Sequence, residues 1–225
     1  MTISDPPLNS TTTTTTTTTT ALLQLAKARR SIYKLSNSSP VPDSTIQELV
    51  DHAVLHMPSG FNTQSTRVAL MLHEEHVKLW DVVVGVFERL VAAGKVGGDV
   101  WESTMRPKLE GMRGAYGTVL FFEDPTHIAP MTEKFPKYKD LFPDWAQHAN
   151  AMHQYYLWLA FQSVGLSSNL QHYNPHIDDA VIKTWDLPSN WKLTAQLVFG
   201  TAVGEPKERA YKPLEERVRV FGARV

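Results

Sequence analysis

The sequence predicts a single domain of the α+β class. Few strand-like runs stand among many helical ones, and the two kinds do not alternate strictly along the chain. With 225 residues, the chain is long enough to bury a core without help from metals or disulfides. A hydrophobic content of 42% and a charged content of 20% are those of an ordinary globular protein. We expect the folded domain to span residues 21–225.

Residues 1–20 are expected to form a disordered tail. Positions 11 to 20 are an unbroken run of threonines, which offers no apolar face to bury. The first ten residues, "MTISDPPLNS", lack the basic start and the apolar core of a signal peptide. An isolated β-ladder of threonines is the alternative for this run.

Two helices are predicted before the first strand. Residues 21–33, "ALLQLAKARRSIY", place apolar side chains at helical spacing and cations near the end, where the helix dipole favours them. A second helix begins at a cap on Asp43 or Ser44 and ends at Pro58. Its inward-facing residues are expected to be Ile46, Leu49, Val50, Ala53 and Val54.

Four strands, and a helix between the first two of them, are predicted from shorter runs of apolar residues. Residues 66–72, "TRVALML", read as a strand, and residues 74–94 form a clear helix that Gly94 ends. A loop with a short helix leads into a second strand, "GTVLFFED", at residues 117–124. A short strand entering a loop and a strong final strand are predicted at residues 166–174 and 192–200.

A long helix at residues 142–165 is unusual in its composition. Its stretch 152–161 is apolar or aromatic on nearly every face, and such a helix must be buried on all sides. In a chain of this size, burial at a subunit interface is the simplest way to achieve that. The alternative is a central helix inside one monomer.

Several classes of function are excluded. A formal net charge of −1 offers no field for nucleic acid or an anionic membrane, and no apolar run is long enough to span a bilayer. The absence of cysteine removes disulfides, thiolate metal sites and thiol nucleophiles, and it permits a reducing compartment. We assign no metal site. The motif "HEEH" lacks an i, i+4 histidine pair, and the pair His52 and His56 lacks a third ligand. His52 and His56 are therefore expected to face solvent. "GMRGAYG" fits no nucleotide-binding fingerprint and is predicted to be a turn, and no GxSxG elbow is present.

Three separated segments keep polar groups that have no evident structural duty. They are residues 29–31, residues 59–64 and residues 207–209. Guanidinium and ammonium groups would neutralise a phosphate, while amides would match the donors and acceptors of a ring. The three segments together suit a ligand with a phosphate at one end and an amide-edged ring at the other. For the adjacent arginines, a solvated helix end is the alternative.

At these residues the sequence resembles the nitroreductase-type flavoproteins, in particular the fungal branch related to the yeast fatty-acid-repression mutant protein. The resemblance runs from about Ala21 to Gly204 and somewhat beyond. Its most specific pieces are "ARRSIY", "PSGFNTQ", "GTVLFFED", "VGLSSNLQHYN" and "AQLVFG". It implies an FMN-binding homodimer with a central, mostly antiparallel sheet flanked by helices, and it implies that the flavin and the long buried helix lie at the dimer interface.

The resemblance also assigns residues to the flavin. Near the phosphate and ribityl chain it places Arg29, Arg30, Ser31, Lys207 and Arg209. In the loop that reaches the flavin from the partner subunit it places Pro58, Ser59, Asn62 and Gln64. In the loop whose backbone N–H faces flavin N5 it places Gln171 and His172. Tyr33 stands where many bacterial members have a lysine near the N1–C2 side of the flavin, and the loss of that cation bears on the redox potential.

The function implied is that of an FMN-dependent oxidoreductase. It would pass hydride from NAD(P)H through flavin N5 to an electron-poor acceptor of the nitroaromatic or quinone type, and no catalytic side chain is assigned. One alternative is a flavin-binding regulatory protein in lipid or stress signalling whose turnover is incidental. Another is a dimeric interaction protein that has lost flavin. The expected location is the cytoplasm, with the nucleus as a second compartment.

Overall fold

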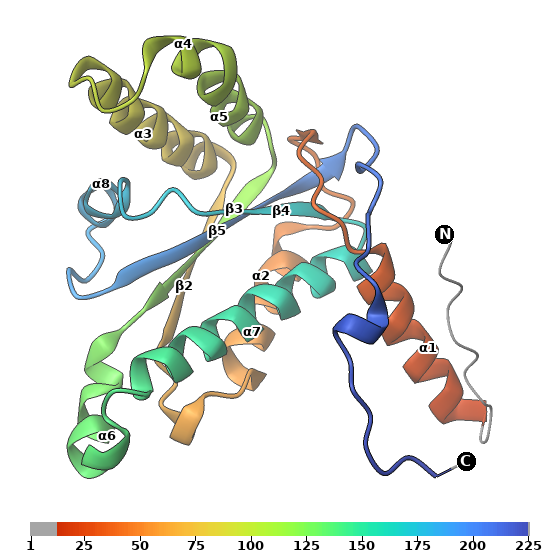
Figure 1. Cartoon of the computed structure of the whole chain (residues 1–225). Coiled ribbons are helices and arrows are strands. Elements are labelled where there is room, and N and C mark those ends of the chain that lie inside the picture. The colour runs from red at the N-terminus through yellow and green to blue at the C-terminus, as the bar shows by residue number, and fades with distance from the viewer. Residues whose placement is uncertain (1–12, 225) are drawn as a thin grey trace.

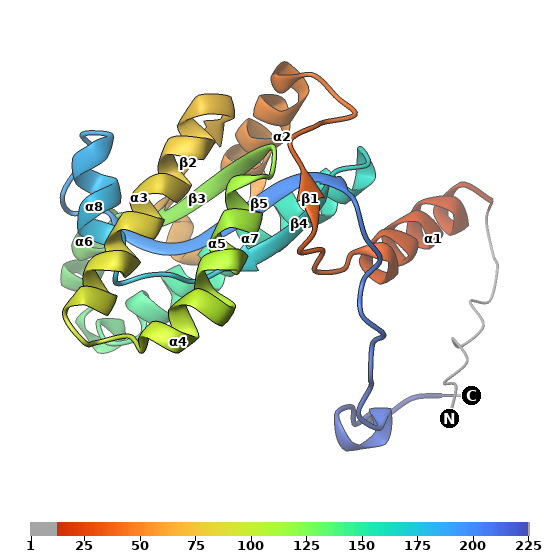
Figure 2. The same cartoon turned by 90° about the horizontal axis from the view of Figure 1, so that it is seen from above.

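A computed structural model describes residues 13–224 of the chain and confirms the α+β class. Its core is a five-stranded sheet with helices on both faces (Figures 1 and 2). The strand order is β1-β5-β3-β2, β4 also pairs with β5, and all these pairings are antiparallel. The predicted central antiparallel sheet flanked by helices is therefore present.

The strands are β1 (Leu35–Ser36), β2 (Thr66–Leu72), β3 (Gly117–Glu123), β4 (Ser167–Gln171) and β5 (Lys192–Ala202). The longer helices are α1 (Thr13–Ala28), α2 (Asp43–His56), α3 (His73–Ala92), α5 (Arg106–Arg113) and α7 (Phe142–Ser163). The shorter ones are α4 (Gly98–Val100), α6 (Ala129–Lys134) and α8 (Asp178–Thr184). Apart from the two-residue β1, each strand was predicted, because each carries a compact apolar run next to turn residues.

The sheet separates two hydrophobic cores. Every residue of β3 is buried, and successive side chains of a strand point to opposite faces. Val119 and Phe121 pack with side chains of α2 and α7 on one face. Leu120 and Phe122 pack with side chains of α3, α5 and α8 on the other. Because both faces are covered, β3 can be apolar throughout.

The boundaries of the first helix differ from the prediction at both ends. Of the predicted disordered tail, residues 1–12 lie outside the described part, and residues 13–20 are the first turns of α1. Once a helix is nucleated, each further residue adds a hydrogen bond, so the helix of residues 21–28 extends backwards into the threonines. At the other end α1 stops at Ala28, because the Ile32 N–H donates to the Ser168 carbonyl at 3.0 Å and Ser31 forms a parallel bridge with Ser168.

Two smaller expectations also need correction. Val54 was predicted to face inward but is 42% exposed, since the buried stripe of α2 consists of Ile46, Val50 and Ala53. The predicted turn "GMRGAYG" begins inside α5, and only the part after Arg113 turns toward β3. His52 and His56 are exposed as expected.

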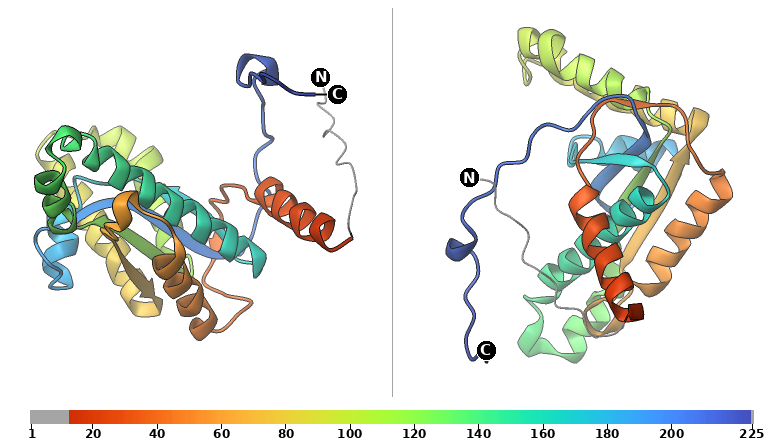
Figure 3. Two further views of the ribbon diagram at one scale, coloured as in Figure 1. Left: turned by 90° about the horizontal axis from the view of Figure 1, so that it is seen from below. Right: turned by 90° about the vertical axis from the view of Figure 1, so that its right-hand side faces the viewer.

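Helix α7 is buried on one side only. Leu157 and Phe161 are fully buried against the sheet, whereas Met152 and Tyr155 are more than 40% exposed. Figures 1 and 3 show α7 lying across one face of the sheet, with α1 and the C-terminal segment leaving the body on one side. A helix covered on all sides is therefore not formed within one chain, and the predicted homodimer interface stays a prediction. Within residues 13–224, no helix combines the length and apolar character needed to cross a membrane.

His76 of α3 is fully buried between the helices and the sheet. Its Nδ1 lies 3.0 Å from the Thr118 hydroxyl, and its Nε2 lies 3.1 Å from the Met112 carbonyl. Because a carbonyl only accepts, Nε2 carries the proton and donates, while Nδ1 accepts from the hydroxyl. Burial lowers the pKa of His76 to about 4, so the ring is neutral at physiological pH.

Acidification should therefore destabilise the fold through His76. The unfolded chain takes up this proton near pH 6.5 and the folded chain only near pH 4, so stability is full above the first value and falls between the two. The loss should reach roughly 3 kcal/mol. Urea unfolding at several pH values would measure it. His76→Gln should flatten this slope, and an unchanged slope in that variant would contradict the assignment.

Candidate functional site

A cleft of about 360 Å³ lies where the segment after α1 meets the segment after β5. Its lining residues are Arg29, Arg30, Ser31, Ile32, Tyr33, Lys34, Gly204, Glu205, Lys207 and Arg209. All five residues predicted for a phosphate site are thus brought together, although about 180 residues of chain separate the two groups. In Figure 1 these segments lie side by side, at the C-terminal end of α1 and along the arm that follows β5.

Backbone pairing between the two ends of the domain creates this cleft. β1 pairs with the end of β5, and the Val203 N–H continues the pairing by donating to the Lys34 carbonyl at 3.0 Å. Farther along, the Arg209 Nη2 donates to the Arg29 carbonyl at 2.8 Å, and the Arg30 guanidinium donates to the Lys207 carbonyl. The arginines therefore fasten the C-terminal arm to the segment after α1.

The cleft carries a strong local excess of positive charge. It is lined by five cationic side chains and a single carboxylate, that of Glu205. Burial, followed by the charge of Arg209, lowers the pKa of Arg29. None of the five cations forms an ion pair with any residue in the described part of the chain. Buried Arg29 Nε also lacks a partner there, so the site fits an anion with several oxygens, such as a phosphate.

Two residues of this region were not assigned to the site from the sequence. The Arg29 guanidinium lies over the ring of Trp158 in α7, 4.5 Å from its centroid, which is a cation–π contact. Ser168 in β4 pairs with Ser31. Trp158 was counted as one more apolar residue of the long helix, and no local pattern could have paired Ser31 with Ser168.

The polar loop of residues 59–64 forms one irregular turn. The Asn62 N–H donates to the Ser59 carbonyl, and the Gln64 N–H donates to the Ser59 hydroxyl, both at 3.0 Å. The Ser59 hydroxyl therefore serves the loop itself, and Pro58 lies exposed at its start. The side-chain amides of Asn62 and Gln64 have no hydrogen-bond partner among residues 13–224, so they are free to bind a ligand.

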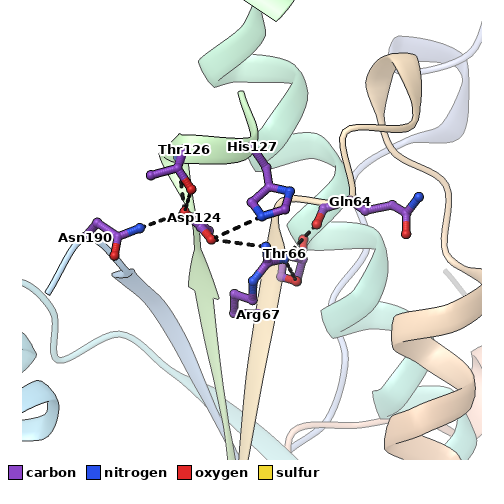
Figure 4. A network of polar contacts seen from close by, with 7 residues as sticks. All are labelled: Gln64, Thr66, Arg67, Asp124, Thr126, His127 and Asn190. Atoms are coloured by element: carbon purple, nitrogen blue, oxygen red, sulfur yellow. Dashed lines mark hydrogen bonds and ion pairs between the residues drawn. The ribbon is translucent and has the colours of Figure 1, made fainter. Parts of the chain in front are cut away.

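The exit of this loop is held by a network around Asp124, shown in Figure 4. Arg67 donates to the Gln64 carbonyl at 2.7 Å and forms an ion pair with Asp124 at 3.1 Å. Asp124 also accepts hydrogen bonds from Thr126 and Asn190. Burial raises the pKa of Asp124, but the hydrogen bonds from Thr126 and the charge of Arg67 outweigh it and hold the pKa below its usual value. Sequence reasoning missed this network, because its members come from three separate segments of the chain.

The two residues predicted at the end of β4 differ in exposure. The Gln171 side chain is buried and donates to Asn169 Oδ1 at 2.7 Å, while Asn169 donates to the Ile32 carbonyl at 2.8 Å. His172 is exposed. Since the Gln171 amide is engaged in the core, only its backbone remains for a ligand. Gln171 follows Ser168 by three residues, about 10 Å along the strand from the cleft.

The loop and the cleft lie at opposite ends of α7. The ring of Phe61 in the loop is 5.8 Å from that of Trp145, whereas Arg29 of the cleft stacks on Trp158. Thirteen residues of α-helix separate the two tryptophans, which corresponds to about 20 Å. A single chain therefore does not bring the predicted loop residues to the predicted phosphate residues.

Residues 26–201, which contain the segment after α1, the loop and all of the sheet except the last residue of β5, match the sequence profile of the Nitroreductase family. The chain belongs to the nitroreductase family. It is 33% identical over 201 residues to HBN1 of Saccharomyces cerevisiae, covering 88% of this chain and 96% of that protein. It is 31% identical over 186 residues to the nitroreductase FRM2 of the same yeast, covering 81% and 89%.

The fold agrees with this assignment. The structure of the nitroreductase CinD from Lactococcus lactis, solved in complex with chloramphenicol, superposes with a TM-score of 0.79 and is 34% identical to this nitroreductase family member. The match covers 89% of this chain and 99% of CinD. The predicted family, its fungal branch and the class of nitroreductase-like oxidoreductase are therefore confirmed.

Removing the Arg67 side chain should loosen the loop. In Arg67→Met the buried Asp124 carboxylate loses its cation and the Gln64 carbonyl loses its donor, so we expect a stability loss of about 2 kcal/mol. Hydrogen exchange should speed up at residues 59–64. Arg106→Met is the control, because the partners of Arg106 are exposed carboxylates and its loss should leave both measurements unchanged. If both variants changed stability and hydrogen exchange equally, Arg67 would not be the residue that holds the loop in place.

Proposed function

We propose that this family member is an FMN-dependent oxidoreductase that takes hydride from NAD(P)H and reduces an electron-poor acceptor of the nitroaromatic or quinone type. The observation that carries the proposal is the basic cleft, with five cations and one carboxylate contributed by both ends of the domain. A phosphate monoester carries close to two negative charges and several acceptor oxygens, which such a cleft matches. Membership in the nitroreductase family supports the redox chemistry.

At the phosphate end, Arg29 and Arg209 are the principal ligands. Burial and then the charge of Arg209 lower the pKa of Arg29, and a phosphate between the two arginines would replace their repulsion by two attractions. Trp158 supports the face of the Arg29 guanidinium and limits its orientation. Arg30, Lys207 and the Ser31 hydroxyl line the same cleft and complete the set of donors.

At the ring end, the chain contributes backbone and amide groups. When bound, the flavin supplies the chemistry, which is hydride acceptance at N5 and hydride delivery to the acceptor. The backbone at the end of β4, at Gln171 and His172, would face N5, while the amides of Asn62 and Gln64 would bind the ring edge. Tyr33, half-exposed in the cleft, takes the place that the lysine of many bacterial members holds. No side chain of this set needs to act as a general acid.

A homodimer would complete this site. The open face of α7 carries Met152 and Tyr155, and a second copy of the chain would cover it. If the two α7 helices pack antiparallel about a two-fold axis, the loop at one end of the first helix meets the cleft at the opposite end of the second. In such a dimer, the loop of one subunit and the cleft of the other form one site, although the loop and the cleft of a single chain lie about 20 Å apart.

Charge removal at the phosphate end should weaken FMN binding selectively. Arg29→Ala or Arg209→Ala should cost about 2 kcal/mol of FMN binding, because a buried phosphate loses a charged donor. Both variants should bind riboflavin, which has no phosphate, as the parent does. Asn62→Ala should cost about 1 kcal/mol for either flavin. Arg219→Ala, on the exposed arm, is the control and should change neither affinity.

Titration of FMN and riboflavin into the apoproteins, followed by quenching of flavin fluorescence, measures these affinities. A parent protein that binds no FMN would overturn the proposal. If FMN binds but NAD(P)H is not oxidised with any nitroaromatic or quinone, the regulatory alternative would be favoured instead.

Disrupting the open face of α7 should separate the subunits. Met152→Glu places a charge in the middle of that face, so light scattering should report a monomer that has lost most of its FMN. Val100→Glu is the matched control, since Val100 is 53% exposed on α4, which lies on the other face of the sheet. A Met152→Glu protein that stays dimeric and loaded with FMN would place the interface elsewhere.

A further inference from the structure

The loop of residues 59–64 is built from strained backbone. Phe61 and Asn62 both have a φ of +55°, and Gln64 has a φ of +48°. Glycine adopts this left-handed region without steric cost, whereas a residue with a β-carbon does so at an energetic cost. Such conformations persist only where the surroundings impose them, and they gather at functional sites. The loop therefore needs contacts that hold it in this shape.

The ring of Phe61, a residue that is 49% exposed, supplies three of these contacts. Its centroid lies 4.9 Å from that of Phe135, 5.4 Å from that of Phe142 and 5.8 Å from that of Trp145. These distances and the tilted or offset arrangements are those of favourable aromatic pairs. The three partners come from the segment between α6 and the start of α7, beside which the loop lies in Figure 1.

Along the chain, the aromatic contacts of Phe61 and the hydrogen bond from Arg67 flank the two unpaired side-chain amides, those of Asn62 and Gln64. Phe61 precedes Asn62 directly, and Arg67 fixes the carbonyl of Gln64 at the loop exit. Asn62 and Gln64 keep side-chain amides that bond to nothing else in the described chain. A loop held at both ends with unpaired amides between them is organised to present those amides.

We propose that Phe61 is a positioning residue for the flavin ring. Through its contacts with Phe135, Phe142 and Trp145, its ring holds the left-handed backbone that directs the amides of Asn62 and Gln64 toward the ring edge of the cofactor. This inference rests on the proposed function. It makes binding at the ring end of the flavin depend on an aromatic cluster that lies, within one chain, about 20 Å from that chain's own phosphate site.

The test is the titration of FMN and riboflavin into Phe61→Ala, Phe61→Leu and Phe61→Tyr apoproteins. The alanine and leucine variants should bind both flavins roughly tenfold more weakly, because both ligands share the ring. The tyrosine variant keeps the ring and should bind both within about twofold of the parent. In the alanine and leucine variants, the absorption band of bound flavin should shift, because the flavin ring loses its amide partners. In the tyrosine variant, the band should stay at the position that it has in the parent.

The control is Tyr138→Ala. Its ring contacts Trp145 at 6.0 Å but forms no ring contact with Phe61, so both flavins should bind as they do to the parent. Melting temperatures of all apoproteins separate general destabilisation from an effect on the flavin. Alanine and leucine variants that bind both flavins like the parent, or that lose FMN alone, would overturn the inference while leaving the proposed function intact. A parent that binds neither flavin overturns both.

Discussion

The packing of α7 against the β3–β5 face is the interaction on which the rest of the structure depends. Leu157 and Phe161 bury their side chains there, and 22 helical residues give α7 a length of about 33 Å. One end of this rigid element carries Trp145 beneath the polar loop, and the other carries Trp158 beneath Arg29. The distance between the two parts of the site is therefore fixed by a helix and not by flexible chain.

The basic cleft shows how little a whole-chain charge says about a local site. The chain has a formal net charge of −1, yet five cations face one carboxylate in the cleft. This concentration arises because β1 pairs with the end of β5, which brings two basic segments from opposite ends of the domain together. The field relevant to a ligand acts over a few ångströms, where the distant carboxylates contribute little.

Both parts of the predicted site contain an arrangement that is unfavourable in the isolated chain. In the cleft, five cations lie near a single carboxylate, and burial together with the charge of Arg209 lowers the pKa of Arg29. In the loop, three residues with side chains adopt a left-handed backbone. Neither feature stabilises the isolated chain, and each is maintained by neighbouring packing, by Trp158 in one case and by the Phe61 cluster in the other.

Much of the secondary structure could be read from the sequence alone, because helices and strands follow local periodicity. The strands at residues 66–72 and 117–124 and the helix that ends at Gly94 agree with the structure for this reason. The order and spacing of the motifs also sufficed to place the chain in the nitroreductase family. The residues predicted for the phosphate site were four basic residues and Ser31, and the structure does gather them in one cleft.

Only the tertiary structure decided how these pieces meet. It ended the first helix at Ala28, because Ile32 pairs with β4, and it divided the predicted site residues between two ends of α7. It also revealed Trp158, Arg67 and Phe61, whose partners lie far away in sequence. The physical reason is that local patterns depend on spacings of two to four residues, whereas these contacts depend on which distant segments pack together.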